Sequence, residues 1–439
     1  MAAFLAARGE ALELEIDNLS HEGRGVARVN QKAVFVAGAL PGERVRVDLL
    51  KRHRQYDEAR AVEILHASPD RVQPRCAHVS VCSGCSLQHL APTAQIAHKQ
   101  QHLLDVLQRI GKVEPQRLLA PLQRDLWGYR RKARLSVRYV EKKGRALVGF
   151  REDNGRYVAE IASCPVLDPR IGVHLDALSQ LVSDMDARAE IAQIEAAAAA
   201  DLVLVFRHLV PLTAADRARL AAFGAQIDAR IVLQPGGLDS LVGLDGDAVP
   251  ELGYRIDGDL EIRYLPLDFV QVNDSINQVM VAQAIDLLSV GARDRVLDLY
   301  CGLGNFTLPL ARRSLHVTGV EGDAGLIARA RVNAAHNGLE NIDYHVADLS
   351  QDQSEAVWSR AGYTRLLLDP PRAGAERVFD YLPGSEVERI VYVSCHPATL
   401  ARDAGILVGR GGFSLEAAGV MDMFPHTGHV ESMALFVRR

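Results

Sequence analysis

The sequence predicts a multidomain protein with a small β-barrel, an α+β middle domain and a C-terminal α/β domain of Rossmann-like type. Five short strand-like runs separated by turn residues fill residues 12–64. Four cysteines then bracket a mixed segment. From residue 266 onward strand and helix patterns alternate, which is typical of a doubly wound parallel sheet. We therefore expect three domains, at residues 1–70, 71–265 and 266–439.

Composition places the chain among soluble globular proteins. Of its 439 residues, 48% are hydrophobic and 24% are charged. No apolar run has the length of a membrane span, and the apolar stretch at the N-terminus is too short for a secretion signal. We therefore expect a cytoplasmic monomer that contacts no membrane.

Charge is distributed unevenly, although the formal net charge is only −5. Residues 20–75 contain 11 Lys and Arg against 7 Asp and Glu, and residues 121–150 contain 9 against 2. The first third of the chain is therefore basic, and this permits a local phosphate-binding face.

The segment predicted to form the barrel has turn signals at His21–Gly25 and Gly38–Gly42. So many short strands suggest a closed barrel of the oligonucleotide-binding type. Gly23-x-Gly25-Val-Ala and the turn Leu40-Pro-Gly-Glu-Arg-Val make it similar to the TRAM domain, a small RNA-binding β-barrel. Its basic side chains either contact a nucleic-acid backbone or face solvent; they are Arg44, Arg46, Lys51, Arg52 and Arg54.

Three cysteines follow the barrel in the spacing Cys76-x5-Cys82-x2-Cys85, and Cys164 lies far downstream. Clustered thiolates in a cytosolic chain select zinc or an iron–sulfur cluster. Zinc sites usually combine two C-x2-C pairs, and that pairing is missing here. The spacing therefore favours a [4Fe–4S] cluster over zinc. A radical enzyme would need C-x3-C-x2-C, so we expect the cluster to be structural.

The middle of the chain carries mixed patterns. Residues 93–111 predict a helix that ends at Gly111 and packs on the C-terminal domain. A second helix is expected over 171–190 and strands near 202–206 and 231–233, whereas the alanine run at 195–200 predicts nothing. The basic run at 129–139 is either an RNA surface or an ordinary half-buried strand.

The C-terminal domain opens with a strand that runs into a glycine turn at Gly302 and Gly304. A dinucleotide fingerprint would need a third glycine at position 307, where threonine stands. Glu321 ends the next strand, placed to accept hydrogen bonds from two ribose hydroxyls. Asp348 ends the third strand, where it can accept from an adenine amino group. Together these groups predict the nucleoside pocket of a methyltransferase.

Two further strand ends carry reactive groups. Asp369 precedes two prolines that stiffen its loop. Amino-group methyltransferases place an aromatic residue after such a loop, and Arg372 stands there instead, which argues against N-methylation. Cys395 ends a buried strand just before Pro397, and a thiol at such a strand end is a candidate nucleophile. Cys301 is the competing thiol, but it lies inside the glycine turn, where a cofactor should pack.

Five motifs make the chain similar to the RNA (uracil-5)-methyltransferase family over nearly its whole length. They are Phe269-Val-Gln-Val-Asn, Asp298-Leu-Tyr-Cys-Gly-Leu-Gly-Asn-Phe, Asp369-Pro-Pro-Arg-Ala-Gly, Ser394-Cys-His-Pro-Ala-Thr-Leu-Ala-Arg-Asp and Phe424-Pro-His-Thr-Gly-His-Val-Glu-Ser. The chain departs from the family at His396, where Asn is usual, and this puts the role of the Asn amide in doubt. The combination of the predicted barrel with the four cysteines resembles the branch of this family that acts on uracil 1939 of 23S ribosomal RNA.

The resemblance implies C5 methylation of a uridine through a covalent bond from Cys395 to uracil C6, with Glu431 as the base that removes the C5 proton. It implies an S-adenosylmethionine pocket made of Gln271, Tyr300, Asn305, Glu321, Asp348 and Asp369. It also strengthens the expectation of a [4Fe–4S] cluster on Cys76, Cys82, Cys85 and Cys164. The expected partner is 23S ribosomal RNA, whose target base must leave its stack.

Other functions stay open at the level of the sequence. Methylation could fall on a transfer RNA or on another ribosomal site. A cytosine-5 methyltransferase is a close rival, and a non-catalytic RNA-binding scaffold with the same fold is a rival of a different class. Measuring methyl transfer to RNA and identifying the product base separates these functions.

Overall fold

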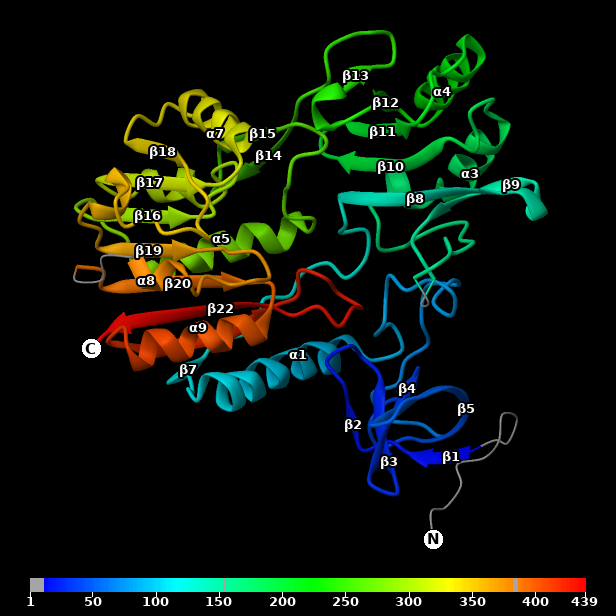
Figure 1. The fold of residues 1–439 in the computed structure, drawn as a ribbon, viewed down its shortest axis with the longest axis horizontal. Helices are drawn as coiled ribbons and strands as arrows, with labels where there is room; N and C mark the ends of the chain where they lie inside the picture. The colour runs from blue at the N-terminus through cyan, green and yellow to red at the C-terminus, as the bar shows by residue number, and fades with distance from the viewer. Residues whose placement is uncertain (1–11, 153–154, 382–385) are drawn as a thin grey trace. The chain divides into compact units, whose positions relative to one another are not determined.

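The computed structural model describes residues 12–152, 155–381 and 386–439, and the N-terminal stretch considered above as a secretion signal lies outside these ranges (Figure 1). The chain forms two units. One comprises Met1–His102 and Phe424–His429, and the other comprises Leu103–Met423 and Val430–Arg439. Within the described ranges, no helix combines the length and the apolar character needed to cross a bilayer.

Six strands form the sheet of the N-terminal unit, in the order β1-β5-β6-β4-β3-β2. Their bounds are β1 (Leu12–Glu15), β2 (Asn18–Leu19), β3 (Gly25–Val29), β4 (Lys32–Ala37), β5 (Arg44–Arg52) and β6 (Tyr56–His66). Alternate residues of these strands, including Val34, Val36, Val45 and Val47, face one buried core. The five strands expected from the sequence are confirmed, and the two-residue β2 is an addition.

A buried carboxylate anchors the turn between β4 and β5. Glu43 is 1% exposed, and it accepts hydrogen bonds from the backbone N–H groups of Leu40 at 2.8 Å and Ser68 at 3.1 Å. The Arg71 guanidinium donates to both of its oxygens, at 2.5 and 2.7 Å. Burial disfavours the charged carboxylate, but these hydrogen bonds outweigh it and lower the pKa of Glu43. The Leu-Pro-Gly-Glu turn is therefore held from inside the unit.

The predicted helix at 93–111 is α1 (Pro92–Val106), continued by the wider turn η1 (Leu107–Gly111). The residue in the left-handed conformation at its end is Lys112, with φ 56°. Gly111 has a different reason to be glycine, because a Cβ there would collide with the Ala401 carbonyl oxygen of α9 (Pro397–Gly409). The C-terminal end of this helix thus packs on α9, as the sequence predicted.

The middle of the chain forms a second six-stranded sheet, in the order β13-β12-β11-β10-β8-β9. Its strands are β8 (Lys132–Val140), β9 (Arg145–Gly149), β10 (Ile191–Ala198), β11 (Leu202–His208), β12 (Ala229–Gln234) and β13 (Val242–Gly243). The helices around it are α2 (Pro169–Gly172), α3 (Leu175–Asp184), α4 (Ala214–Gln226) and the short turns η2 (Glu141–Lys143) and η3 (Leu238–Ser240). The hairpin β14 (Leu252–Ile256) and β15 (Leu260–Tyr264) follows.

Two expectations for this region differ from the structure. The helix predicted over 171–190 is broken into α2 and α3, and it ends at Asp184. The alanine run at 195–200 lies mostly in β10, a central strand between β8 and β11. Small side chains suit this position because Ala196, Ala197 and Ala198 are all buried.

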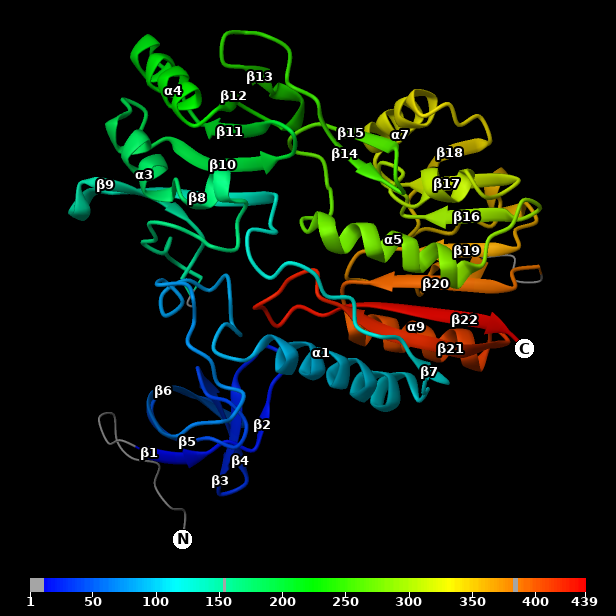
Figure 2. The same ribbon diagram turned by 180° about the vertical axis from the view of Figure 1, so that it is seen from behind.

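The C-terminal sheet has eight strands, in the order β18-β17-β16-β19-β20-β22-β21-β7. Its strands are β7 (Arg117–Leu118), β16 (Arg295–Leu299), β17 (His316–Glu321), β18 (Ile342–Val346), β19 (Arg365–Leu368), β20 (Arg389–Ser394), β21 (Phe413–Met421) and β22 (Glu431–Arg438). Its other helices are α5 (Asp274–Leu288), α6 (Thr307–Ala311), α7 (Ala324–His336), η4 (Val357–Arg360) and α8 (Val378–Tyr381). Figures 1 and 2 show α9 and α5 on opposite faces of this sheet.

The direction of these strands determines where a ligand can bind. β16 to β20 are parallel, and β22 runs antiparallel to β20. The strand order reverses at β16, which pairs with β17 on one side and β19 on the other. In open α/β sheets ligands bind at such a reversal, beyond the carboxyl ends of the strands. The doubly wound sheet expected from the sequence is present, and it places the candidate site at that edge.

Candidate active site

The carboxyl edge of the C-terminal sheet gathers most of the predicted site residues. The glycine turn follows β16, and Glu321 is the last residue of β17. Asp369 follows β19 and Cys395 follows β20. Because these strands are parallel and adjacent, their carboxyl ends lie side by side.

Backbone amides fix the Glu321 carboxylate beside the glycine turn. It accepts hydrogen bonds from the N–H groups of Gly302 at 3.3 Å, Gly322 at 2.7 Å and Asp323 at 3.1 Å. Tyr300 turns the chain into the loop with a φ of 65°, a conformation that non-glycine residues rarely adopt. This strained backbone at the mouth of β16 is a common property of ligand-binding turns.

Tyr300 lies among acidic side chains of the same edge. Burial, followed by the charges of Asp403, Asp348 and Glu321, raises the pKa of Tyr300 to about 12. Asp348 itself is exposed and accepts from the N–H and hydroxyl of Ser350, at 3.0 and 2.6 Å, which lowers its pKa. The structure thus brings the predicted residues Tyr300, Glu321 and Asp348 to one side of the glycine turn.

Asn305 contributes to the wall of the turn through both ends of its amide. It exchanges two hydrogen bonds with the Asn277 amide, at 2.9 and 3.0 Å. Its oxygen also accepts from the Tyr254 hydroxyl at 2.9 Å. The side chain therefore joins β14, α5 and the glycine turn, a role that the sequence did not predict.

Gln271 is held through its backbone by Arg131 from the basic run. The Arg131 Nε donates to the Gln271 carbonyl oxygen at 2.9 Å, and its Nη1 donates to Asp274 at 2.8 Å. The guanidinium also lies over the Tyr254 ring, 4.4 Å from the centroid. The basic run is thus divided: Arg131 and Lys132 are buried, while Arg134 and Arg138 face solvent.

Two groups lie buried beneath the glycine turn. Burial, with smaller effects from the charges of Asp369 and Glu321, raises the pKa of Asp298 to about 7. Its Oδ2 accepts from the Thr307 hydroxyl at 2.5 Å. Burial also raises the pKa of Cys301, which is 4% exposed, well above its usual value. A thiol that stays protonated and covered is a poor nucleophile, and this agrees with the rejection of Cys301.

Cys395 and Glu431 lie on neighbouring strands at the same edge of the sheet. Cys395 follows β20, Glu431 is the first residue of β22, and the last residue pair of this antiparallel ladder is Ser394 with Ser432. Burial and the charges of Glu431 and Asp369 raise the pKa of Cys395 to about 11, and the charge of Arg372 lowers it. The charges of Glu431, Asp369 and Arg372 thus act on the Cys395 thiol.

The Asp369 carboxyl completes this group. The residue is partly exposed, yet its carboxyl is enclosed by protein, and this burial raises the pKa of Asp369 to about 7. A carboxyl with that pKa can exist in either protonation state near neutral pH. The structure thus brings together a thiol, two carboxyls and a guanidinium at the ends of β19, β20 and β22.

Comparison with known proteins identifies the kind of site. The family model described as tRNA (Uracil-5-)-methyltransferase matches residues 93–439, and the TRAM domain model matches residues 6–62. The 23S rRNA (uracil(1939)-C(5))-methyltransferase of Stenotrophomonas maltophilia (strain K279a) is 55% identical over 97% of this chain and 97% of its own. The corresponding protein of Xylella fastidiosa (strain 9a5c) is 54% identical over 98% of both chains.

The chain belongs to the tRNA (Uracil-5-)-methyltransferase family.

A solved structure shows the same fold. The tRNA (uracil-54, C5)-methyltransferase of Pyrococcus abyssi, in complex with S-adenosyl-L-homocysteine, has a TM-score of 0.72 and 23% identity. The similarity covers 97% of this chain and 100% of that one. It confirms the methyltransferase fold expected for the C-terminal sheet, and the TRAM match confirms the expected N-terminal domain. The three domain boundaries stay a prediction.

The departure from the family motif at position 396 has a structural explanation. His396 is the N-cap of α9, and its ring Nδ1 accepts from the Thr399 N–H at 3.4 Å. Asn is among the preferred N-cap residues because its side-chain oxygen accepts the same kind of hydrogen bond. His396 thus makes the kind of capping hydrogen bond that Asn is able to make at an N-cap.

Asp403 is a residue of the site that the sequence did not single out. It is fully buried, and its carboxylate accepts from the Tyr392 hydroxyl at 2.6 Å, the Ala375 N–H at 2.7 Å and the Arg402 Nε at 2.8 Å. The loop that it holds also carries Gly374, whose φ of 81° and close contacts with Asp403 leave no room for a side chain. Asp403 therefore ties the Asp369-to-Ala375 loop to β20 and α9.

The cysteines of the predicted metal site lie in both units. Cys76, Cys82 and Cys85 are partly buried, and the backbone N–H groups of His78 and Gly84 donate to the first two sulfurs at 3.4 Å. Cys164 belongs to the other unit. Within the part of the chain that the structure describes, no three metal-ligating side chains are grouped as a metal site. The cluster therefore stays a prediction.

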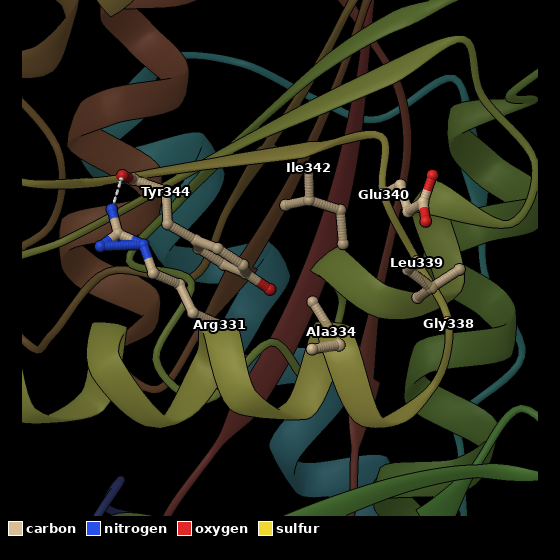
Figure 3. A pocket seen from close by; sticks show the side chains of 8 residues that line it. Arg331, Ala334, Gly338, Leu339, Glu340, Ile342 and Tyr344 are labelled. Atoms are coloured by element: carbon tan, nitrogen blue, oxygen red, sulfur yellow. Dashed lines mark hydrogen bonds between the residues drawn. The ribbon is translucent and has the colours of Figure 1, made fainter.

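A separate cavity of about 300 Å³ lies between α7 and β18 (Figure 3). Its lining consists of Arg331, Ala334, Ala335, Gly338, Leu339, Glu340, Ile342 and Tyr344. The Arg331 guanidinium donates to the Tyr344 carbonyl oxygen beside it. None of the predicted catalytic or cofactor residues lines this cavity, so it belongs to the flank of the sheet and not to the reaction site.

Proposed function

We propose that this chain methylates C5 of a uridine in 23S ribosomal RNA, with S-adenosylmethionine as the methyl donor, and that the uridine is uracil 1939. The names of the two bacterial relatives and their identity along the whole chain support the reaction and the RNA. The observation that carries the chemistry is that Cys395 follows β20 and Glu431 begins the neighbouring strand β22, where the charge of Glu431 acts on the Cys395 thiol.

The chemistry follows from the weak nucleophilicity of uracil C5. Cys395 Sγ bonds to C6, and the electron pair of the C5–C6 double bond moves toward C5 and the adjacent carbonyl. S-adenosylmethionine, when bound, would supply an electrophilic methyl group to C5, and its sulfur would keep the electron pair of the broken carbon–sulfur bond and leave as S-adenosyl-L-homocysteine. After transfer, C5 carries both the methyl and its original hydrogen. Glu431 accepts that hydrogen as a proton, the double bond reforms and Cys395 leaves as a thiolate.

The methyl donor would be held by the residues around the glycine turn. Glu321 has its carboxylate oriented by three backbone amides, which leaves it suited to accept from ribose hydroxyls. Tyr300 and Asp348 flank it, while Asn305 and Gln271 are fixed by Asn277, Tyr254 and Arg131. Asp369 follows β19, between the glycine turn after β16 and Cys395 after β20, so its enclosed carboxyl lies where donor and base would meet.

A [4Fe–4S] cluster held by Cys76, Cys82, Cys85 and Cys164 is part of the proposal. Support comes from the donor set: three thiols within ten residues, two of which already accept backbone N–H groups. Such hydrogen bonds to sulfur are one of the means by which proteins stabilise cluster thiolates. The cluster's contribution would be to hold its loop in one conformation.

The iron content of the protein tests the metal assignment. Protein purified without air should be brown and contain about four irons per chain, as a cubane with four thiolate ligands requires. Replacing any one of the four cysteines by serine should lower that content, whereas Cys301→Ser should not. Stoichiometric zinc without iron would overturn the assignment.

Mapping the modified nucleotide tests the function itself. The purified protein is incubated with labelled S-adenosylmethionine and with 23S ribosomal RNA or transfer RNA from cells that lack this activity. Label in 5-methyluridine at a single 23S position is the expected result. Label in transfer RNA would show that the substrate is a different RNA, and label in 5-methylcytidine would show that the target base is cytosine. No transfer to any RNA would favour a non-catalytic scaffold.

A further inference from the structure

The segment that leads to Glu431 belongs to the N-terminal unit and not to the sheet that it enters. β21 ends at Met421 and β22 begins at Glu431, and the intervening residues Phe424–His429 belong with the N-terminal unit. The backbone of Phe424–His429 is hydrogen-bonded to the loop that follows Cys85. The Leu87 N–H donates to the His426 carbonyl oxygen at 2.9 Å, and the Gly428 N–H donates to the Ser86 hydroxyl at 3.1 Å.

A buried glutamine of α1 forms hydrogen bonds with both the loop that follows Cys85 and the segment Phe424–His429. Gln95 is 1% exposed, and its Oε1 accepts from the His426 N–H at 2.9 Å. Its Nε2 donates to the carbonyl oxygens of Leu87 at 3.0 Å and Leu90 at 2.8 Å. One amide thus fixes both the loop after Cys85 and the segment before Glu431, and it does so out of contact with water.

A buried lysine adds a charged contact to this arrangement. Lys99 lies one turn further along α1, is 1% exposed, and donates from Nζ to the Phe424 carbonyl oxygen at 3.0 Å. The backbone of the segment is strained at His426, whose φ is 67°. Gly428 packs so closely on the His21 carbonyl oxygen that a Cβ would not fit there. A strained backbone persists only where its surroundings hold it in place.

We infer that Gln95 and Lys99 are positioning residues for the general base, and that the loop after Cys85 acts with them. Through the segment Phe424–His429, they determine where β22 starts and therefore where the Glu431 carboxylate lies. The inference rests on the proposed function, since it needs Glu431 to remove the C5 proton. It gives the cysteine loop a chemical role: its conformation is transmitted through Ser86 and Leu87 to the catalytic base.

The step affected should be proton removal and not methyl transfer. Cys395, Asp369 and the glycine turn follow β20, β19 and β16, which belong to a different unit from Gln95 and Lys99. A displacement of about 1 Å in a catalytic group costs about 100-fold in rate. Loss of either contact should therefore slow the release of the methylated base and leave the earlier steps intact.

The test compares Gln95→Met and Lys99→Met with wild type and with Gln108→Met as the matched control. Gln108 lies in η1, and its side chain donates to the exposed Glu114. Each full-length protein is incubated with 23S ribosomal RNA and labelled S-adenosylmethionine, then separated on a denaturing gel. We expect turnover to fall about 10- to 100-fold in the first two variants. Methyl-labelled RNA should then stay bound to the protein, while the affinity for S-adenosylmethionine changes less than about twofold.

A conservative variant keeps the inference testable if Gln95→Met does not fold. Gln95→Glu retains an oxygen that accepts from the His426 N–H but loses the donor to Leu87 and Leu90. The amount of covalent adduct in this variant should therefore lie between that of wild type and that of Gln95→Met. Slow turnover without an adduct, or normal turnover, in the Gln95 and Lys99 variants would overturn the inference.

Glu431→Gln distinguishes a failure of the positioning role from a failure of the proposed mechanism. An adduct in that variant and none in the Gln95 and Lys99 variants overturns the positioning role alone. No adduct in Glu431→Gln overturns the assignment of the base, and with it the proposed mechanism.

Discussion

Cys395 lies among charges that oppose its activation. The carboxyls of Glu431 and Asp369 add to burial in raising the pKa of its thiol to about 11, and Arg372 alone among the charges named here lowers it. At neutral pH the thiol is therefore protonated in the protein without substrate. Attack on uracil C6 needs the thiolate, so the rate of this step should rise as the pH approaches the pKa of the Cys395 thiol.

Arg372→Gln should slow the formation of the covalent bond. Removing the guanidinium removes the charge that lowers the pKa of Cys395, so that pKa rises and the pH–rate profile shifts to higher pH. Each unit of the shift lowers the thiolate fraction at neutral pH about tenfold. Single-turnover methylation measured from pH 6 to 9 checks this. The control is Arg377→Gln, an exposed arginine of the same loop paired with Asp380; an unshifted profile in Arg372→Gln would contradict it.

At the scale of residues, sequence reasoning proposes the reactive groups but not the residues that hold them in place. Cys395 was recognisable because a strand pattern ends there before a proline, and Glu431 because its motif resembles a family. Gln95 and Asn277 carry no such signal, and Asp403 is the last residue of the motif that begins at Ser394, which indicates no role for it. Each is a common polar residue whose importance depends on partners that may be hundreds of positions away, as His426 is from Gln95.

Among the elements, the loop after β19 depends on a single buried carboxylate. Asp403 accepts from Tyr392, Ala375 and Arg402, and these contacts fix the loop that carries Asp369 and Arg372. β20, α9 and this loop therefore behave as one structural group. Its geometry should set both the stability of the C-terminal sheet and the distance between the charges around Cys395.

Asp403→Asn should destabilise the protein and slow methylation. An amide offers one acceptor oxygen where the carboxylate offers two, so a buried N–H or O–H loses its partner. Such a loss costs about 1–3 kcal/mol. Urea unfolding measures the change in the free energy of unfolding, and Asp380→Asn on the exposed side of α8 is the control. Equal stability of the two variants would show that Asp403 is not the anchor.

The elements also show where patterns in the sequence stop being informative. The alternation of strands and helices after residue 266 predicts the doubly wound sheet because the strands β16, β17, β19 and β20 are buried along most of their length. The longer helices α5, α7 and α9 each bury part of their surface. The alanine run at 195–200 has no periodicity, so β10 was not predicted. The break between α2 and α3 was missed as well, because both helices share one apolar pattern.

For the whole molecule, the barrel is the part whose function depends on charge. Lys51, Arg52 and Arg54 are exposed at the end of β5 and in the turn that follows it. Contacts of such side chains with phosphates release counterions and therefore weaken with salt. This agrees with a TRAM domain that helps to bind the RNA substrate and takes no part in the chemistry.

Replacing Lys51, Arg52 and Arg54 together by glutamine should weaken RNA binding and leave S-adenosylmethionine binding unchanged. Each lost phosphate contact should reduce the slope of log affinity against log salt concentration by about 0.7–0.9. Affinity for 23S ribosomal RNA measured between 50 and about 200 mM salt checks this. An unchanged affinity and slope would assign the barrel a spacer role.

The covalent mechanism depends on the order of two events at one carbon, methyl transfer and proton loss. Glu431→Gln should permit the first and block the second, since an amide cannot accept the C5 proton at an appreciable rate. A general base contributes about 10²–10⁴-fold, so the methylated RNA should remain attached to Cys395. On a denaturing gel, label from S-adenosylmethionine should migrate with the protein–RNA complex, and Cys395→Ala in the same variant should abolish that band. Normal turnover of Glu431→Gln, or RNA binding without any labelled adduct, would contradict the mechanism.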